Sequence, residues 1–136
     1  MGATKVEKVI MKYEFGVAAG TTAIGAHKLG VLPAGAIITK AWIDIDTTFT
    51  SATDAATIAL GYTGAAGAFD AAIAINDASN PWDAAAPRVS VGAADGAVGN
   101  YVVIGASPVE VLATIAVEAI STTGKGYLYV EYVVNA

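Results

Sequence analysis

The amino-acid sequence predicts an all-β fold, an antiparallel β-sandwich or barrel formed by a single domain over residues 1–136. Several segments alternate apolar and polar residues with a period of two, which is typical of strands that bury one face. Turn signals containing glycine or proline separate these segments at even intervals, a pattern that favours a sandwich or barrel over a parallel α/β sheet. No repeat of fixed period and no linker indicates a second domain.

The C-terminal segment from Ser107 to Val134 carries the strongest of these patterns. Its first half alternates small or branched apolar residues with Glu110, Thr114 and Glu118, which predicts a long half-buried strand. Residues 121–126 supply turn chemistry with two glycines, and a second alternating run follows over residues 127–134. The segment is therefore expected to form a β-hairpin.

The remaining elements are shorter, and the clearest is the run AIITKAWIDID at residues 36–46. The expected strands, besides the C-terminal pair, cover residues 9–15, 22–29, 36–46, 56–62, 89–91 and 100–104. A turn is expected at residues 31–35, where proline and glycine lie close together. The spacing of Phe69, Ile73 and Asn76 permits at most one short helix near residues 69–76.

Composition indicates that part of the surface is covered by another molecule. Hydrophobic residues make up 55% of the chain and charged residues 14%, against about 45–50% and about 25% in ordinary domains. A chain with so little charge is expected to hide apolar area in an oligomer or against a partner. The competing interpretation is an alanine-rich domain, since alanine is tolerated at surfaces.

The charge balance and the absence of cysteine exclude several classes of function. A net charge of −5 argues against nucleic-acid binding, which needs a basic patch for phosphate. With no cysteine there is no disulfide, thiol nucleophile or thiolate metal site. Pro108, Glu110 and Glu118 interrupt the longest apolar window, so no membrane span is expected there. The N-terminus lacks the apolar core of a signal peptide, and Val6 stands where a myristoylation motif needs Ser or Thr.

The sequence contains three candidate chemical sites, and each lacks part of the pattern that its chemistry requires. Gly61, Gly64 and Gly67 lack the spacing and the lysine of a phosphate cradle, which favours a surface loop. His27, the only histidine, has no local triad signature and is expected to be structural or exposed. Asp44 and Asp46 share one strand face, where paired carboxylates suit acid–base hydrolysis or, together with Asp54, Ca²⁺ binding, but no glycine-punctuated calcium loop accompanies them. We expect no catalytic residue, no metal and no cofactor, and hence no enzyme.

Four aromatic residues remain as candidate contact residues: Trp42, Trp82, Tyr127 and Tyr129. Trp42 falls among Lys and Asp on the polar face of its strand, where it serves either an interface or a loop of its own subunit. Trp82, Tyr127 and Tyr129 suit a stacking platform for a sugar or peptide. Packing or subunit contact is the commoner use of aromatics on a β surface.

Two segments resemble small structural proteins of tailed bacteriophages. The first is LPAGAIITKAWIDIDTTFTSATDAATIALGYTG, residues 32–64, with a Pro-x-Gly turn, a long strand, a Ser-Ala-Thr-Asp stretch and Thr-Ile-x-Leu-Gly. The second is VEVLATIAVEAISTTGKGYLYVEYVV, residues 109–134, which is similar to their closing hairpin. Together these segments cover somewhat under half of the chain, and neither is a catalytic fingerprint.

The resemblance implies a virion component, most often a capsid decoration or cement protein. Such proteins are small β-sandwiches, often jelly rolls and commonly homotrimers, on the outer face of the major capsid protein shell. On this basis Trp42, Tyr127 and Tyr129 are expected in subunit packing. Lys5, Lys8 and Lys12 are expected on an extended N-terminal arm, residues 1–12, that grips the shell. The alternative is a tail or fibre module that recognises a host surface or another virion protein, with loops 61–67 and 76–87 as the expected contacts to a host.

Overall fold

A computed structural model describes residues 2–3, 5–84, 89–90 and 102–135, which form nine β-strands in two antiparallel sheets. Within these ranges the chain forms no helix, and so none that could cross a membrane. The strands are β1 (Val6–Gly16), β2 (Gly25–Leu32), β3 (Ile37–Thr47), β4 (Thr57–Tyr62), β5 (Ala65–Ala74), β6 (Val89–Ser90), β7 (Val102–Val103), β8 (Val109–Ala116) and β9 (Lys125–Asn135). The predicted all-β sandwich is confirmed.

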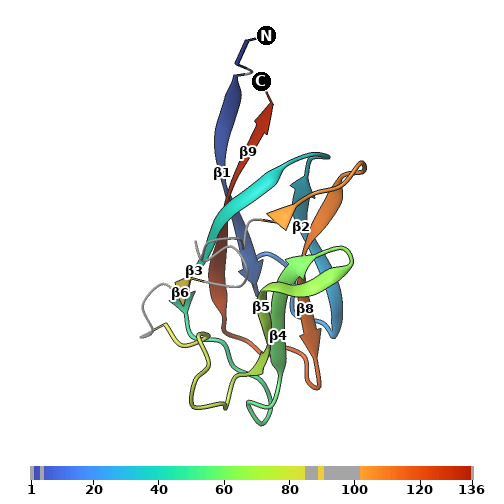
Figure 1. Cartoon of the computed structure of the whole chain (residues 1–136). Helices are drawn as coiled ribbons and strands as arrows, with labels where there is room; N and C mark the ends of the chain where they lie inside the picture. Colours follow the sequence, from blue (N-terminus) through green and yellow to red (C-terminus); the bar gives the residue numbers. More distant parts are fainter. Residues whose placement is uncertain (1, 4, 85–88, 91–101, 136) are drawn as a thin grey trace.

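The order of the strands is that of a jelly roll. Sheet A has the order β1-β9-β3-β6, with β7 also paired to β3, and sheet B has the order β2-β8-β4-β5. The chain passes from one sheet to the other after β1, β2, β3, β5, β7 and β8, as in a double Greek key. Figure 1 shows the two sheets with β1, β9 and β3 on one side and β2, β8, β4 and β5 on the other.

The expected C-terminal hairpin is wrong, because β8 and β9 belong to different sheets. β8 lies between β2 and β4, whereas β9 lies between β1 and β3. Alternation correctly predicts which residues of each strand are buried. The two strands, however, cover the same core from opposite sheets. The first arm also ends earlier than expected, at Ala116, and Val117 follows with a positive φ of 71°. This left-handed residue starts the crossing between sheets.

The strand expected at residues 36–46 is present as β3, but its two faces change partway along. Ala41, Ile43 and Ile45 are buried as the alternation predicts. Near the start of the strand, however, Ile38 is buried and Ile37 is exposed. The register with β9 shifts between Ile38 and Lys40, and a bulge of this kind reverses the facing of the residues before it.

No helix forms near residues 69–76, since β5 continues through Ala74 and a turn follows. β5 pairs with β4 as a hairpin with two register shifts. Phe69 is buried and its ring meets Tyr62 edge-on, with 5.8 Å between the ring centres. The irregular pairing explains why the spacing of apolar residues in this segment departs from strict alternation.

The core lies between the sheets and is densest at one end, which we call the closed end. There β1, β3 and β8 finish and β2 and β9 begin. The rings of Phe15, Phe49 and Trp82 pack together, with Phe15 and Phe49 stacked at 5.4 Å between centres. Gly124 stands against Phe49, so closely that an added Cβ would lie 2.4 Å from the ring.

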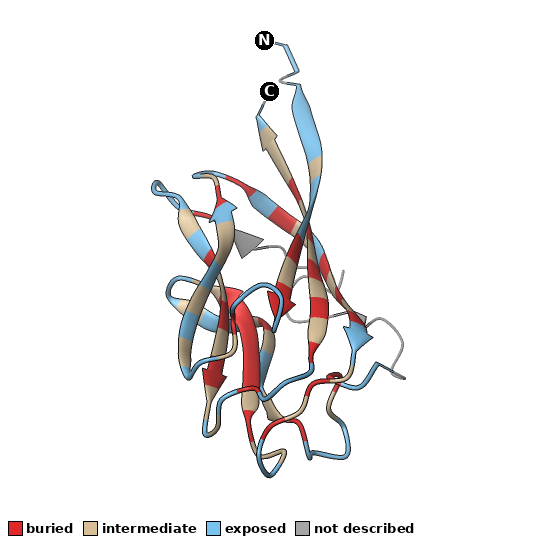
Figure 2. Ribbon diagram, turned by 180° about the vertical axis from the view of Figure 1, so that it is seen from behind, coloured by how far each residue is buried: buried red, intermediate tan, exposed pale blue. Residues whose placement is uncertain are grey.

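At the opposite end two strands extend past the rest of the sandwich. Figures 1 and 2 show the start of β1 and the end of β9 standing clear of the other strands, next to both chain termini. We call the paired residues Val6–Ile10 and Glu131–Asn135 the projecting ribbon; Glu131–Val133 still pair with β3 on their other side, and Val134 and Asn135 extend past it. Figure 2 shows mostly exposed residues along the β1 side of this ribbon and buried residues lower down. A two-stranded ribbon alone is marginally stable in water.

Candidate interaction surfaces

The glycine-rich segment expected as a loop is a tight hairpin between β4 and β5. Gly61 lies inside β4, where a Cβ would meet the Ala65 carbonyl oxygen at 2.2 Å. Gly64 provides the turn with a φ of 88°, and Gly67 lies in β5. Gly61 thus allows the close approach of the two strands, and Gly64 allows the turn between them.

His27 and Asp54 each make a separate local contact. His27 Nε2 lies 2.6 Å from the carbonyl oxygen of Ala23 in the preceding turn. Asp54 accepts a hydrogen bond from the Ser51 amide at 3.0 Å, in the connection after β3. Across the described ranges, no three His, Cys, Asp or Glu side chains gather closely enough to hold a metal ion.

An ordered row of rings and ammonium groups lies on the outer face of sheet A. Trp42 of β3 stacks on Tyr129 of β9, with ring centres 5.1 Å apart and planes 4° apart. The Lys12 ammonium lies 4.0 Å from the centre of the Tyr127 ring and 5.8 Å from that of Tyr129. Lys40 lies 5.2 Å from the Trp42 ring. The register explains this row, because Lys12 and Trp42 both lie directly opposite Tyr129.

These contacts bring four of the predicted contact residues together: Lys12, Trp42, Tyr127 and Tyr129. The three rings are half-buried, and they stand beside one another across neighbouring strands. Aromatic–aromatic and cation–π contacts of this kind are each worth about 0.5–1.5 kcal/mol. The row therefore stiffens the face of sheet A while its ring edges remain accessible.

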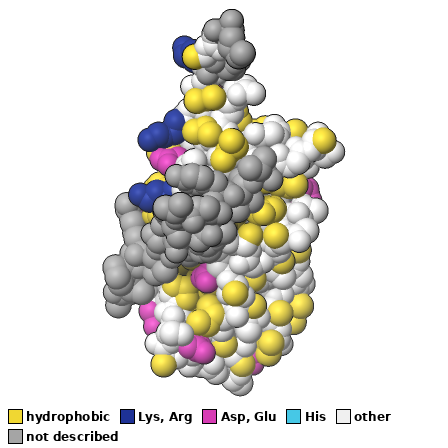
Figure 3. All heavy atoms as spheres, in the orientation of Figure 1, with side chains coloured by type: hydrophobic (Ala, Val, Ile, Leu, Met, Phe, Trp, Pro, Cys, Tyr) yellow, Lys and Arg dark blue, Asp and Glu magenta, His cyan; other side chains and the backbone are white. Residues whose placement is uncertain are grey.

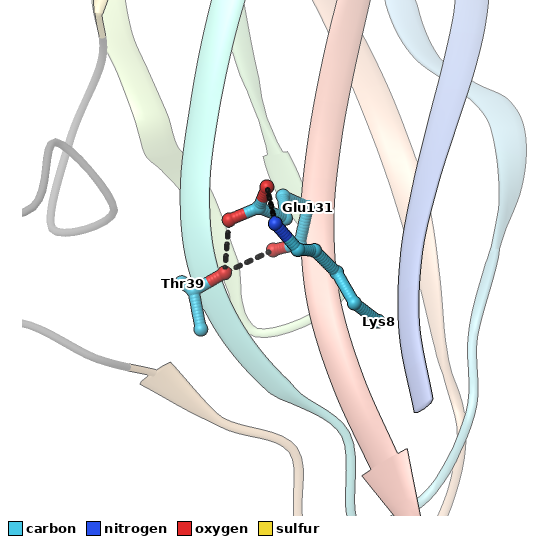
Figure 4. A network of polar contacts seen from close by, with 3 residues as sticks. All are labelled: Lys8, Thr39 and Glu131. Atoms are coloured by element: carbon cyan, nitrogen blue, oxygen red, sulfur yellow. Dashed lines mark hydrogen bonds and ion pairs between the residues drawn. The ribbon is translucent and has the colours of Figure 1, made fainter. Parts of the chain in front are cut away.

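Higher on the same face, Lys8 and Glu131 connect three strands (Figure 4). The Lys8 ammonium lies 3.5 Å from Glu131 Oε1. The Thr39 hydroxyl donates to Glu131 Oε2 at 2.8 Å and approaches the Glu131 carbonyl oxygen at 3.3 Å. The lysine side chain is largely exposed, so this ion pair contributes little stability by itself.

Trp82 is a correction to the sequence analysis, which placed it among the contact residues. Its side chain is 0% exposed, and its indole N–H donates to the Ile73 carbonyl at 3.0 Å. The ring is edge-on to both Phe15 and Phe49. Pro81 and the neighbouring polar residues gave the appearance of a surface loop. The chain at this point folds inward because a large apolar ring gains more from burial than the loop loses.

Exposed large apolar residues gather at the two opposite ends of the sandwich. They are Val6, Ile10, Val31 and Ile37 at the ribbon end and Val17, Ile24 and Val117 at the closed end, with Met11 midway along β1. Val117 and Ile24 are the most exposed, at 66% and 61%. Exposed apolar groups that cluster in this way are typical of surfaces that bind another protein.

Charge is spread unevenly between the same two ends. Lys5 lies just ahead of β1, Lys8 lies in the ribbon and Lys12 lies farther along β1. Acidic residues predominate at the closed end, including Asp46, Asp54, Asp77, Asp83 and Glu118. Figure 3 shows basic side chains on the upper half of one face and most of the acidic ones on the lower half. The lysines near the ribbon are thus interspersed with acids, among them Glu7 and Glu131.

Glu118 holds the closed end together, a role that sequence reasoning missed. Its carboxylate accepts from the Ser51 hydroxyl at 2.6 Å, from both the hydroxyl and the amide of Thr53, and from the Ala55 amide. These bonds lower the pKa of Glu118 to about 2. We call Ser51–Ala55 with Glu118 the Glu118 knot. The Ser-Ala-Thr-Asp stretch signalled a polar turn, but its partner lies far along the chain.

In the described chain, the two non-glycine residues with positive φ lie in or beside the knot: Asp54, at 59°, is within it, and Val117, at 71°, directly precedes Glu118. Asp54 is a residue type that tolerates this conformation, whereas a β-branched valine is strained in it. Val117 is held there because the next residue, Glu118, is fixed by four hydrogen bonds. The hydrogen bonds of Glu118 thus hold Val117 in a strained conformation in which its apolar side chain is exposed to solvent.

Asp70 is the other acid with a strongly shifted pKa. Burial raises the pKa of Asp70 to about 6. Its buried Oδ2 contacts no hydrogen-bond donor among the described residues. Asp70 belongs to no group of three or more His, Cys, Asp or Glu side chains in the described chain.

With this geometry in view, comparison with known proteins gives a result at the level of structure. No protein-family pattern matches the chain, and no curated protein matches its sequence. A chain in the acidic stable capsid structure of Helicobacter pylori bacteriophage KHP30 has the same fold, with a TM-score of 0.65 and 21% identity. The match covers 97% of this chain and 95% of that one.

Two further phage structures contain similar chains. One is the capsid asymmetric unit of cyanophage Pam1, with a TM-score of 0.62, 19% identity and coverage of 96% of this chain and 86% of that one. The other is the capsid of Ralstonia phage GP4, with a TM-score of 0.64, 17% identity and coverage of 96% and 86%. The jelly roll described above is thus a fold present in the capsids of three phages.

Proposed function

We propose that this chain is a non-enzymatic structural protein of a tailed-phage virion. Within that class, we propose a decoration or cement protein that binds the outer face of the major capsid protein shell as a homotrimer. The observation that carries the proposal is the end-to-end likeness to chains in three phage capsid structures. High coverage in both directions means that those chains are also small, with little beyond this domain.

The distribution of exposed residues supports a protein that works by binding. Apolar side chains are exposed at both ends of the sandwich, and the ribbon end adds the basic residues Lys5, Lys8 and Lys12. Contacts made only with the assembled shell favour that shell over its dissociated subunits by mass action. Three linked copies increase the avidity without requiring tight individual contacts.

The ribbon is the element that we assign to the shell. It is the part of the described chain that stands clear of the sandwich. Its exposed residues Val6 and Ile10 combine apolar area with neighbouring lysines, a pairing that suits an apolar surface with an acidic rim. The aromatic row of Trp42, Tyr127 and Tyr129 on sheet A is assigned to packing between the three subunits.

The test is co-sedimentation of the purified protein with empty phage shells that lack it. Full-length protein is expected to sediment with shells, and a variant without residues 1–8 is expected to stay in the supernatant. Lys28→Ala, which removes an exposed lysine on β2, is the matched control and is expected to bind normally. Light scattering on the same samples measures the oligomer, with a trimer expected.

A full-length protein that ignores shells would overturn the decoration assignment. The tail or fibre module would then lead, and binding to host cells would be measured next. If the variant lacking residues 1–8 still binds shells, the decoration role stands and the ribbon is not the contact.

A further inference from the structure

The outer edge of β1 differs from every other sheet edge in the described chain. β1 is eleven residues long, and its pairing with β9 runs through all eleven without a register shift. The edges of sheet B are irregular, because β2 has one register shift and β5 has two. The far edge of sheet A consists of the two-residue strands β6 and β7.

Irregular pairing and very short strands are devices that protect an edge from pairing with another chain. β1 uses neither, and it contains no proline. It also exposes apolar side chains on both of its faces, with Ile10 at 53% on the outer face and Met11 at 39% on the inner face. A long, regular, partly apolar edge is a template for another strand.

The sequence of β1 matches itself in one antiparallel register. When Met11 is placed opposite Met11 of a second copy, all eleven residues find a partner and Lys8 falls opposite Glu14. Two-fold symmetry makes this ion pair occur twice. On the inner face Val9 falls opposite Tyr13, which extends the apolar layer of each sandwich.

The neighbouring registers are unfavourable. Strands that keep the same face inward can slip only by steps of two residues, because a single step exchanges the faces. One such slip places Lys8 opposite Lys12 of the second copy, and the opposite slip places Lys12 on Lys12. Like charges directly opposite each other are destabilising. Charge therefore selects the register centred on Met11.

We propose that the β1 edge is a self-association site, at which two copies of this chain join antiparallel strands and continue sheet A across a two-fold axis. The contact is separate from the three-fold contact proposed for the trimer, but it shares Val6–Ile10 with the ribbon assigned to the shell, so a given β1 edge joins either a second copy or the shell. A trimer has three such edges, so each can join a neighbouring trimer. Lys8 keeps its ion pair with Glu131 and reaches Glu14 of the second copy with its remaining donors.

The absence of cysteine from the chain gives a direct test, carried out on the full-length protein without shells. Only the residue on the two-fold axis lies opposite itself, so Met11→Cys is expected to form an interchain disulfide on mild oxidation. Directly opposed Cα atoms lie about 4.5 or about 5.5 Å apart, and both distances suit a disulfide. The product is a dimer on a non-reducing denaturing gel.

Two single-cysteine variants serve as register controls. The Val9→Cys thiols lie four positions apart, about 14 Å along the strand, and the Val6→Cys thiols lie about 34 Å apart. Both are expected to give at least tenfold less dimer than Met11→Cys at equal concentration. Equal dimer from all three variants, or none from Met11→Cys, would overturn the proposal.

A charge exchange gives a second readout that does not depend on disulfide geometry. In the Met11→Cys background, Lys8→Glu and Glu14→Lys are each expected to slow dimer formation severalfold, since each places like charges opposite one another. The double variant Lys8→Glu with Glu14→Lys is expected to restore the rate. Failure of the double variant to recover would refute the register. Shell co-sedimentation is measured separately, so this result and the decoration assignment can fail independently.

Discussion

The two ends of this jelly roll differ in whether their polar groups and apolar side chains find partners within the chain. At the closed end, polar groups and rings are matched within the chain: the Glu118 carboxylate accepts four hydrogen bonds, and Trp82 is buried against Phe15 and Phe49. At the ribbon end β1 keeps a free edge and exposed apolar residues. The closed end thus satisfies its polar groups and rings within the chain, although Val17, Ile24 and Val117 stay exposed there, whereas the ribbon end leaves a strand edge unpaired.

This difference shows where the free energy of folding resides and where binding can act. Residues whose contacts are all internal contribute to the stability of the isolated chain. Residues such as Val6 and Ile10 contribute almost nothing until a second molecule covers them, because their apolar area stays in water. Substitutions at the two ends should therefore separate stability from association.

The largest expected effect on stability comes from Trp82, which is buried in the core, and it is best measured against Trp42, which lies on the outer face of sheet A. Trp82→Ala should lower the free energy of unfolding by about 3–5 kcal/mol, since it opens a cavity and leaves the Ile73 carbonyl unpaired. Trp42→Ala, the matched surface variant, should cost about 1 kcal/mol through loss of the stack on Tyr129. Urea denaturation measures both, and equal losses would contradict the placement of Trp82 in the core.

The next effect concerns the Glu118 knot and depends on pH. The folded-state pKa of Glu118 is about 2, below the ordinary value of 4.5, so the charged carboxylate stabilises the fold above pH 4.5. That contribution is lost as the pH falls from 4.5 towards 2. Glu118→Gln should lower the Tm by several degrees at pH 7, and the difference from the parent should shrink over this interval.

Glu110→Gln is the matched control for the knot. Glu110 lies on the exposed face of β8 and pairs only loosely with Lys28, at 3.5 Å. An exposed ion pair of this kind contributes little, so the Tm of this variant should follow the parent at every pH. A Glu118→Gln deficit that stays constant down to pH 2 would show that the carboxylate charge does not hold the knot.

How far the sequence predicts this molecule can be seen in β8 and β9. Period-two alternation identified both strands and the residues that they bury, because each strand has one apolar face. It also suggested that they pair with each other, which is wrong. Alternation states that a face is buried but not in which sheet, and Ser121–Gly126 suits a crossing between sheets as well as a hairpin.

The contact residues show the same limit. Lys12, Trp42 and Tyr129 could be predicted as surface residues from their polar neighbours, and the structure brings them into one row. Trp82 was misplaced because its neighbours are polar while its ring lies in the core. The partners of Glu118 begin at Ser51, sixty-seven positions away, and no local pattern in the sequence connects them.

The smallest expected effect on stability lies at the ribbon. It separates folding from association most clearly, because an exposed and a buried isoleucine can be compared. Ile10→Ala should change the free energy of unfolding by no more than about 0.5 kcal/mol, because the side chain is exposed. Ile38→Ala, at a fully buried position on β3, should cost about 2–5 kcal/mol. For association the order should reverse, since Ile10 lies on the free edge and Ile38 lies inside the sandwich. If Ile10→Ala left dimer formation by Met11→Cys unchanged but destabilised the fold, the ribbon would be a folding element rather than a binding one.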